Sequence, residues 1–211
     1  MLDFFQSVLS LGTLPDADLS RRVMSIDSIF QSFPQLETKR LVLRRLQGTD
    51  SDALYSILGD EEVTRYYDDA TFIQVSQANE QIEAWENGFL HRRCIRWGIT
   101  LKENGVLTGT CGYYGIHPWH MRASIGYELG HPYWRLGLMT EALNAIIDLG
   151  FKDMNLNRVD ALVMPDNIAS IRLLEKIGFK NEGLLRGYEN WGSKGFTDLY
   201  ILSLLRSHAH L

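Results

Sequence analysis

The pattern of hydrophobic and polar positions predicts a domain of mixed strands and helices from about residue 41 onward. Short apolar or alternating runs predict strands at residues 41–46, 95–101, 106–116, 122–129, 158–163, 181–188 and 196–204. Apolar residues at helical spacing predict helices at residues 51–58, 76–92, 140–152 and 168–177. Because strands and helices do not alternate strictly, we expect an α/β domain with a mixed sheet.

The first 36 residues differ from the rest and predict a helical extension. Apolar residues recur at helical spacing on either side of the breaker at residues 12–15: Phe4, Phe5, Val8 and Leu9, then Leu19, Val23, Ile26 and Phe30. We therefore divide the chain into an extension, residues 1–36, and a main domain, residues 37–211. Such an extension docks on its own domain or on a partner subunit, which leaves a homodimer open.

Composition and charge narrow the classes of partner. The formal net charge of −5 argues against nucleic acid, whose phosphates bind basic surfaces. Cys94 and Cys111 are too few for a disulfide scaffold or a zinc site, so a reducing cytoplasmic setting is expected, with Cys111 as a small buried residue. No stretch approaches the ~18 apolar residues of a membrane helix, so we expect a soluble protein without a membrane partner.

The segment Glu128–Glu141 contains the most informative feature, a strand-to-helix turn. A strand ends, a loop with Gly130 and Gly137 follows, and a helix begins near Leu138. The first amides of a helix lack internal partners and favour negative charge. Gly137 lets the backbone approach a ligand closely, and Arg135 adds positive charge. These parts suit a pyrophosphate, although a tight turn without a ligand would have the same pattern.

Two motifs resemble the GNAT superfamily of acetyltransferases. Trp134–Met139 is similar to its acyl-coenzyme A motif, Gln/Arg-x-x-Gly-x-Gly/Ala, although only Gly137 matches strictly. The longer Tyr133–Ala142 resembles one branch, the enzymes similar to ribosomal-protein N-terminal alanine and serine acetyltransferases. Asn167–Phe179, followed by Glu182–Arg186, is very close to the signature of that branch.

The resemblance runs from about residue 36 to residue 205 and implies the GNAT fold, a mixed, mostly antiparallel sheet with splayed central strands flanked by helices. Here the splayed strands would be 122–129 and 158–163, with acetyl-CoA between them. The coenzyme-binding residues that the resemblance implies are Leu129, Arg135, Leu136, Gly137, Leu138, Met139, Thr140 and Asn167. Asn167 is also a favoured helix N-cap residue, with Asp166 as an alternative cap, so a purely structural role stays open.

The implied reaction is direct transfer of acetyl from acetyl-CoA to a primary amine, without an acyl-enzyme. Only a neutral amine can attack, so a general base is required. Glu128 lies at the end of strand 122–129 on its polar face, and Glu189 occupies the place of a proposed catalytic glutamate in relatives. Either residue could instead be a solvated surface carboxylate.

The resemblance assigns the acid that protonates the departing thiolate to Ser170. Many relatives use a tyrosine where this chain has Leu174, and the ribosomal-protein branch is similar to this chain in using a serine instead. An ordinary serine in the first turn of a helix is the alternative. The backbone amide near Leu129 or Gly130 could polarise the thioester carbonyl.

Histidines and aromatic residues give weaker signals. The loop histidines His117, His120 and His131 have no acidic or cysteine partner in register, so no metal is expected. Five aromatic residues could line an acceptor pocket or belong to the core: Tyr66, Tyr67, Trp97, Tyr114 and Trp119.

These observations together predict an acetyl-CoA-dependent N-acetyltransferase that acts on the N-terminal amine of a peptide or protein. A small amine, such as a polyamine or an aminoglycoside, is the alternative acceptor. A catalytically silent acyl-CoA-binding module is the alternative class, because Trp134 and Met139 depart from the general motif and no tyrosine stands at position 174.

Overall fold

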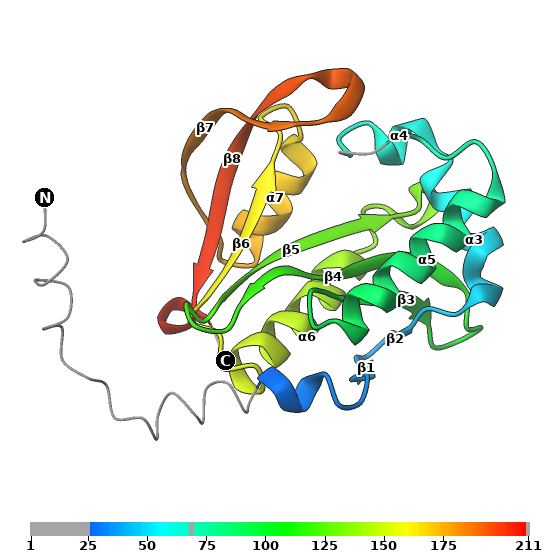
Figure 1. Cartoon of the computed structure of the whole chain (residues 1–211), viewed down its shortest axis with the longest axis horizontal. Coiled ribbons are helices and arrows are strands. Elements are labelled where there is room, and N and C mark those ends of the chain that lie inside the picture. Colours follow the sequence, from blue (N-terminus) through cyan, green and yellow to red (C-terminus); the bar gives the residue numbers. More distant parts are fainter. Residues whose placement is uncertain (1–25, 68–69, 210–211) are drawn as a thin grey trace, which may run out of the picture.

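The computed structural model describes residues 26–67 and 70–209, which form a sheet flanked by helices (Figure 1). The strands within this part of the chain are β1 (Leu36–Glu37), β2 (Leu41–Arg45), β3 (Ile95–Leu101), β4 (Leu107–His117), β5 (Arg122–Leu129), β6 (Arg158–Val163), β7 (Lys180–Asn190) and β8 (Phe196–Leu205). Their order across the sheet is β1-β2-β3-β4-β5-β6-β8-β7. Neighbouring strands are antiparallel except for the parallel pair β5 and β6.

The helices vary from single turns to four turns. The α-helices are α3 (Ser51–Leu58), α4 (Glu61–Thr64), α5 (Val75–Leu90), α6 (Leu138–Lys152) and α7 (Ile168–Lys176). The short 3-10 helices are η2 (Gly48–Asp50), η3 (His131–Tyr133), η4 (Gly192–Lys194) and η5 (Arg206–His208). The expected mixed α/β sheet is thus present, and the predicted strands 95–101, 122–129 and 158–163 match β3, β5 and β6 residue for residue.

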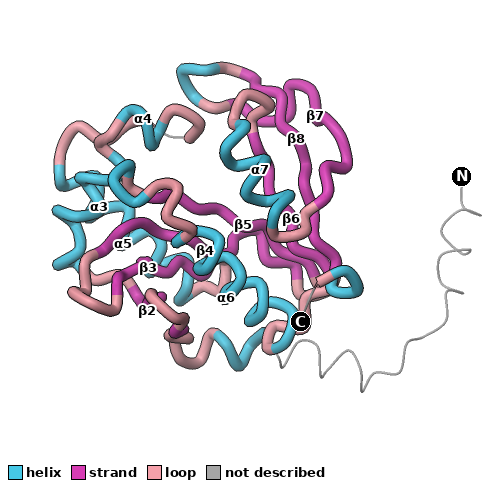
Figure 2. The backbone as a smooth tube through the Cα atoms, turned by 180° about the vertical axis from the view of Figure 1, so that it is seen from behind, coloured by secondary structure: helices cyan, strands magenta, loops and turns pink. Residues whose placement is uncertain are grey.

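Alternation along β3 explains why helices cover both faces of the sheet (Figures 1 and 2). Ile95, Trp97 and Ile99 are fully buried in the main core, which also contains residues of α6. Arg96 points to the other face, where its guanidinium lies 4.9 Å from the ring centre of Trp85 on α5. The sheet therefore has an α6 face and an α5 face.

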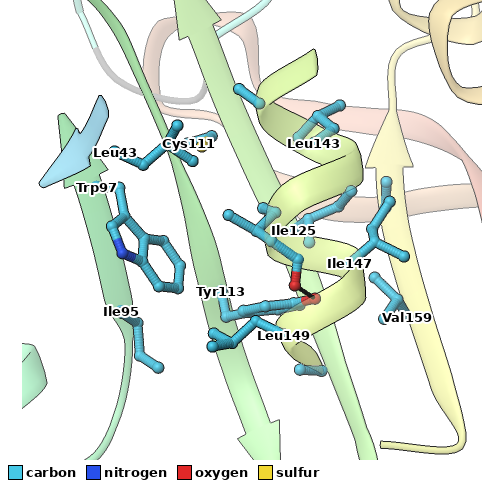
Figure 3. Close-up of a cluster of buried hydrophobic side chains, with 14 of the residues drawn as sticks. Leu43, Ile95, Trp97, Cys111, Tyr113, Ile125, Leu143, Ile147, Leu149 and Val159 are labelled. Atoms are coloured by element: carbon cyan, nitrogen blue, oxygen red, sulfur yellow. Dashed lines mark hydrogen bonds between the residues drawn. The ribbon is translucent and has the colours of Figure 1, made fainter. Parts of the chain in front are cut away.

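The main core fills the space between α6 and the central strands (Figure 3). Tyr113 of β4 lies fully inside it, and its hydroxyl donates to the main-chain oxygen of Ile146 on α6 at 2.8 Å. Cys111 is fully buried as expected, and burial raises the pKa of its thiol to about 12. Trp97 belongs to this core, so of its two interpretations, pocket lining and core, the core is correct.

The described part of the N-terminal extension packs against the main domain. Ile26 is 4% exposed, and the ring of Phe33 lies 5.0 Å from Phe89 and 5.8 Å from Trp97. The indole nitrogen of Trp97 also donates to the Pro34 oxygen at 2.6 Å. Residues 26–36 therefore complete the core, whereas the helices expected over residues 1–25 lie outside the described residues. Within the described ranges, no helix is long and apolar enough to cross a membrane.

Candidate active site

The turn between β5 and α6 has the geometry of an anion-binding site. Gly137 occupies the N-cap position of α6 with φ of 75°, and no side chain among the described residues caps the first amides of this helix. Arg135 also adopts a left-handed conformation, with φ of 61°. A hydrogen bond ties the turn to the end of β5, because Trp134 Nε1 donates to the Leu129 oxygen at 2.6 Å. Its main-chain donors are thus arranged around the start of α6, where the helix dipole favours negative charge.

A second set of contacts anchors this turn to the start of the sheet. Glu141, in the first turn of α6, accepts hydrogen bonds from the Thr38 hydroxyl at 2.6 Å and from Arg40 N and Nε at 2.7 Å each. Arg40 Nη1 donates to the Leu136 oxygen at 2.9 Å. Burial alone would raise the pKa of Glu141, but these donors hold it below its usual value. The sequence gives no signal for this anchor, because Arg40 and Glu141 are 101 residues apart.

Strands β5 and β6 part from each other beside this turn. Their ladder pairs Arg122, Ala123 and Ser124 with residues 158–160 and then ends, although β5 continues to Leu129. At the last pair, Ser124 Oγ donates to Asp160 Oδ1 at 2.5 Å. The two strands that the resemblance identifies as splayed are therefore the two that diverge here.

A cavity of about 1100 Å³ occupies the space where the strands part. Its lining includes Tyr127 and Leu138 on the α6 face of the sheet, and Arg96 and Glu128 on the α5 face. The site residues expected from the sequence that line it are Glu128, Leu129, Arg135, Gly137, Leu138, Met139, Thr140, Asn167, Ser170 and Glu189. Leu136, the remaining one, is 56% exposed in the turn itself.

Asn167 and Ser170 lie at the start of α7, at the wall of the cavity. Asn167 is the N-cap residue, and its Oδ1 accepts from the Ser170 amide at 3.1 Å, so the cap comes from Asn167 rather than from Asp166. The Ser170 hydroxyl lies 2.6 Å from the Tyr127 hydroxyl on β5. This bond joins the two walls of the cavity, and sequence reasoning did not identify Tyr127 as a site residue.

Glu128 is a buried and fully engaged carboxylate. Its residue is 6% exposed, Arg96 Nη2 donates to Oε2, and the Thr110 hydroxyl donates to Oε1. Arg96 Nε also donates to Thr110 Oγ1 at 2.6 Å. Burial opposes the charge of Arg96, but Glu128 holds the pKa of the guanidinium above its usual value. The alternative of a solvated surface carboxylate is therefore wrong for Glu128.

Glu189 lies on β7 and has a more open environment. Its Oε2 accepts from Trp191 Nε1 at 3.0 Å, and Oε1 has no hydrogen-bond partner in the described part of the chain. The residue is half-buried at the cavity wall. Glu189 thus has a carboxylate oxygen available to a ligand, which Glu128 lacks.

The tip of the β7–β8 hairpin reaches toward α4 (Figure 1), and Glu189 and Trp191 near it line the cavity. Lys194 Nζ donates to the main-chain oxygens of Arg65 at 3.0 Å and Tyr67 at 2.5 Å. Of the five aromatic residues considered from the sequence, Tyr66, Tyr67 and Tyr114 line the cavity, whereas Trp119 is 66% exposed at the β4–β5 turn. The helix α4, which helps to form this side, was not predicted because it has only four residues.

The remaining polar candidates have ordinary structural surroundings. The Gly130 amide donates to the Thr108 oxygen at 2.8 Å, so of the two proposed carbonyl-polarising amides only that of Leu129 remains a candidate. His131 lies beside Trp134, with ring centres 4.5 Å apart. Among the described residues, no group of three or more His, Cys, Asp or Glu side chains is placed to hold a metal ion.

Comparison with protein families decides which family has this turn and this sheet. A model described as an acetyltransferase (GNAT) domain matches residues 40–180, well over half of the chain. The chain belongs to the GNAT acetyltransferase family. The predicted fold and the prediction of an acetyl-CoA-dependent N-acetyltransferase are thereby confirmed.

Similar proteins place the chain within the GNAT family. The uncharacterized N-acetyltransferase p20 of Bacillus licheniformis is 42% identical over 172 residues, which are 81% of this chain and 96% of that protein. The ribosomal protein uS5-alanine N-acetyltransferase of Escherichia coli is 38% identical over 64 residues, 30% of this chain and 33% of that protein. Mycobacterium smegmatis RimJ, solved with CoA-disulfide, superposes with a TM-score of 0.71 at 22% identity and covers 81% of this chain and 84% of that one. The predicted likeness to the ribosomal-protein branch is confirmed.

Proposed function

We propose that this GNAT acetyltransferase transfers acetyl from acetyl-CoA to the N-terminal amine of a peptide or protein. The observation that carries the proposal is a single cavity that joins the β5–α6 turn to a region lined by Glu189 and Trp191. One end suits an anionic coenzyme, and the other offers a carboxylate to an amine. The match to the E. coli ribosomal-protein enzyme is short, so it supports the acceptor class without assigning a particular protein.

The coenzyme end would be held mainly by the backbone. The amides from Leu136 to Thr140 would bind the pyrophosphate, with Arg135 adding positive charge. Within the described part of the chain, the start of α6 has no side-chain cap that competes for these amides. Asn167 Oδ1 already caps α7, and the amide nitrogen of the same side chain would donate to the pantetheine arm. The Leu129 amide would polarise the thioester carbonyl.

Glu189 is the better of the two candidate bases. Both oxygens of Glu128 already accept hydrogen bonds from Arg96 and Thr110, so a proton placed there would break one of these bonds and leave a buried guanidinium without its counter-charge. Glu189 has an oxygen without a partner in the described residues and lines the same cavity. We therefore assign the base to Glu189 and a structural role to Glu128.

The transfer needs no acyl-enzyme. Glu189 takes one proton from the ammonium form of the acceptor, directly or through water, and the nitrogen lone pair then forms a bond to the thioester carbon. When the C–S bond breaks, its electron pair goes to sulfur. The nitrogen loses its second proton as the amide forms, and the sulfur takes up a proton through the Ser170 hydroxyl, which is reprotonated in the same step. The products are an amide, free coenzyme A and the proton that Glu189 returns to solvent.

Release of coenzyme A thiol with a panel of acceptors tests the proposal. We expect turnover with peptides that begin with alanine or serine, and mass spectrometry should place the acetyl group on the N-terminal nitrogen. The same peptides with a blocked N-terminus are the matched control and should give no product. Turnover with polyamines or aminoglycosides but not with peptides would contradict the proposed acceptor, and tight acetyl-CoA binding without turnover on any amine would favour a silent module.

The setting of the reaction follows from the same proposal. A peptide or protein acceptor made in the cytoplasm would meet the enzyme there, and we propose that location. Fractionation of cells that express the tagged chain tests it, with activity in the soluble fraction as the expected result.

A further inference from the structure

The hydrogen bond between Tyr127 and Ser170 joins β5 to α7 at the wall of the cavity proposed for the coenzyme. Tyr127 lies three residues beyond the last β5–β6 pair, and Ser170 lies in the first turn of α7. Their hydroxyl oxygens are 2.6 Å apart, although the two residues are 43 positions apart in the chain. Both line the cavity. The bond therefore connects two walls that otherwise diverge.

The chemistry of the two hydroxyls decides the direction of this bond. A phenol is a stronger donor and a weaker acceptor than an aliphatic alcohol, so Tyr127 donates and Ser170 accepts. Burial raises the pKa of Tyr127 further above its usual value, so it keeps its proton at every physiological pH. The Ser170 hydrogen must then point elsewhere.

Only a few directions are left for that hydrogen. A serine in a helix can donate to the carbonyl four residues before it, which here would be Asp166, but the structure has no such bond. Donation from Tyr127 also polarises the Ser170 hydroxyl and makes it a stronger donor. In addition, Ser170 lies at the start of α7, where the helix dipole favours a negative charge.

We propose that Tyr127 is a positioning residue that donates to Ser170 and thereby directs the Ser170 proton toward the sulfur of coenzyme A. This inference deepens the proposed function, on which it rests. When the C–S bond breaks and its electrons go to sulfur, the Ser170 hydrogen bond stabilises the thiolate until it takes up a proton. Tyr127 keeps its own proton throughout. A tyrosine on the opposite wall of the cavity thus supports the serine, at a site where Leu174 can supply no proton.

Binding of the product coenzyme A tests this inference without any acceptor. A site that stabilises thiolate lowers the pKa of the bound thiol below that of free coenzyme A, a simple alkyl thiol whose pKa lies above the ~8.5 of cysteine. A bound value one unit lower makes coenzyme A bind at least about fourfold more tightly at pH 9.5 than at pH 6.5. Desulfo-coenzyme A lacks the sulfur, so it is the control. Any pH dependence of its affinity comes from the other ionisable groups that line the cavity, which include Glu128, Glu189, Arg172 and Lys176.

Calorimetric titration of both ligands at the two pH values gives the decisive comparison. In the native chain, we expect coenzyme A to gain at least about fourfold in affinity over its desulfo analogue between the two pH values. The gain should be at most twofold in Tyr127→Phe, and Ser170→Ala should show the same loss. Ser170→Thr, which keeps a hydroxyl, should retain most of the gain. Tyr55→Phe, which removes a tyrosine hydroxyl outside the cavity, should retain all of it. A full gain in Tyr127→Phe, or none in the native chain, would overturn the inference.

Turnover provides a second, independent measurement. Tyr127→Phe should lower kcat about tenfold, with acetyl-CoA affinity unchanged, because the lost interaction strengthens only as sulfur gains charge. The double variant Tyr127→Phe/Ser170→Ala should be no slower than Ser170→Ala alone, since Tyr127 acts through Ser170. Multiplied losses in the double variant would show that Tyr127 acts elsewhere. Failure of coenzyme A binding itself would instead refute the proposed function.

Discussion

At the scale of single residues, the two glutamates of the cavity differ in how many of their oxygens are already engaged. Glu128 has both oxygens bonded to Arg96 and Thr110, and Glu189 has one bonded to Trp191. The same residue type therefore has two roles in one cavity. Neighbouring side chains, rather than the carboxylate itself, determine which glutamate can exchange a proton with a ligand.

Replacement of the proposed base should affect chemistry and not coenzyme binding. Glu189→Gln keeps the size of the side chain and its bond from Trp191, but it cannot take a proton. We expect kcat to fall about a hundredfold, within the usual range for loss of a general base. Acetyl-CoA affinity, measured by calorimetry, should change less than twofold, and an unchanged kcat would exclude the assignment.

Replacement of Glu128 should affect stability instead. Glu128→Gln leaves the buried Arg96 guanidinium without a counter-charge, which costs about 3 kcal/mol of unfolding free energy. Urea denaturation measures this loss. The paired variant Arg96→Met/Glu128→Leu removes both charges and should recover a large part of it. A Glu128→Gln variant that is fully stable but inactive would contradict the structural role and favour Glu128 as the general base.

At the scale of elements, the β5–α6 turn depends on a glycine in a left-handed conformation. Gly137 has φ of 75°, and Gly105, in the β3–β4 turn, has φ of 71° with open space around it. The two glycines thus share a backbone conformation, but only Gly137 lies at the cavity. This pair allows backbone strain to be separated from coenzyme binding.

Leucine at either position should cost about 1 kcal/mol of stability, because a side chain disfavours this backbone conformation. Only Gly137→Leu should weaken acetyl-CoA, by about tenfold or more, since its side chain would crowd the proposed pyrophosphate site. Thermal unfolding and calorimetry measure the two effects. Equal acetyl-CoA affinity in Gly137→Leu and Gly105→Leu would refute the assignment of the turn.

The elements themselves follow closely from the sequence, whereas the contacts between them do not. Clean alternation of polar and apolar residues predicts β5 to the residue, and short apolar runs predict β3 and β6 to the residue. The helix α4 was missed, since four residues contain too little periodicity. Glycines and apolar positions also indicate the β5–α6 turn. The bond between Tyr127 and Ser170 could not be predicted, because it depends on how two distant elements pack.

At the scale of the whole molecule, the cavity reaches both faces of the sheet, so donor and acceptor need not share an entrance. Initial rates should therefore show a ternary-complex pattern, with intersecting lines in double-reciprocal plots. Product coenzyme A should compete with acetyl-CoA but not with the amine. Parallel lines would indicate an acyl-enzyme and contradict direct transfer.

The contact between Lys194 and the segment before residue 68 has a consequence for how acceptor preference can diversify. Lys194 donates hydrogen bonds to the main-chain oxygens of Arg65 and Tyr67, and every amino acid provides such an oxygen. Side chains at positions 65 and 66 can therefore be exchanged without breaking these two hydrogen bonds, whereas the Tyr67 side chain also packs against the smaller hydrophobic core. Single substitutions at Arg65 or Tyr66 could therefore change which acceptors fit the cavity, while the hydrogen bonds that hold the hairpin tip stay in place.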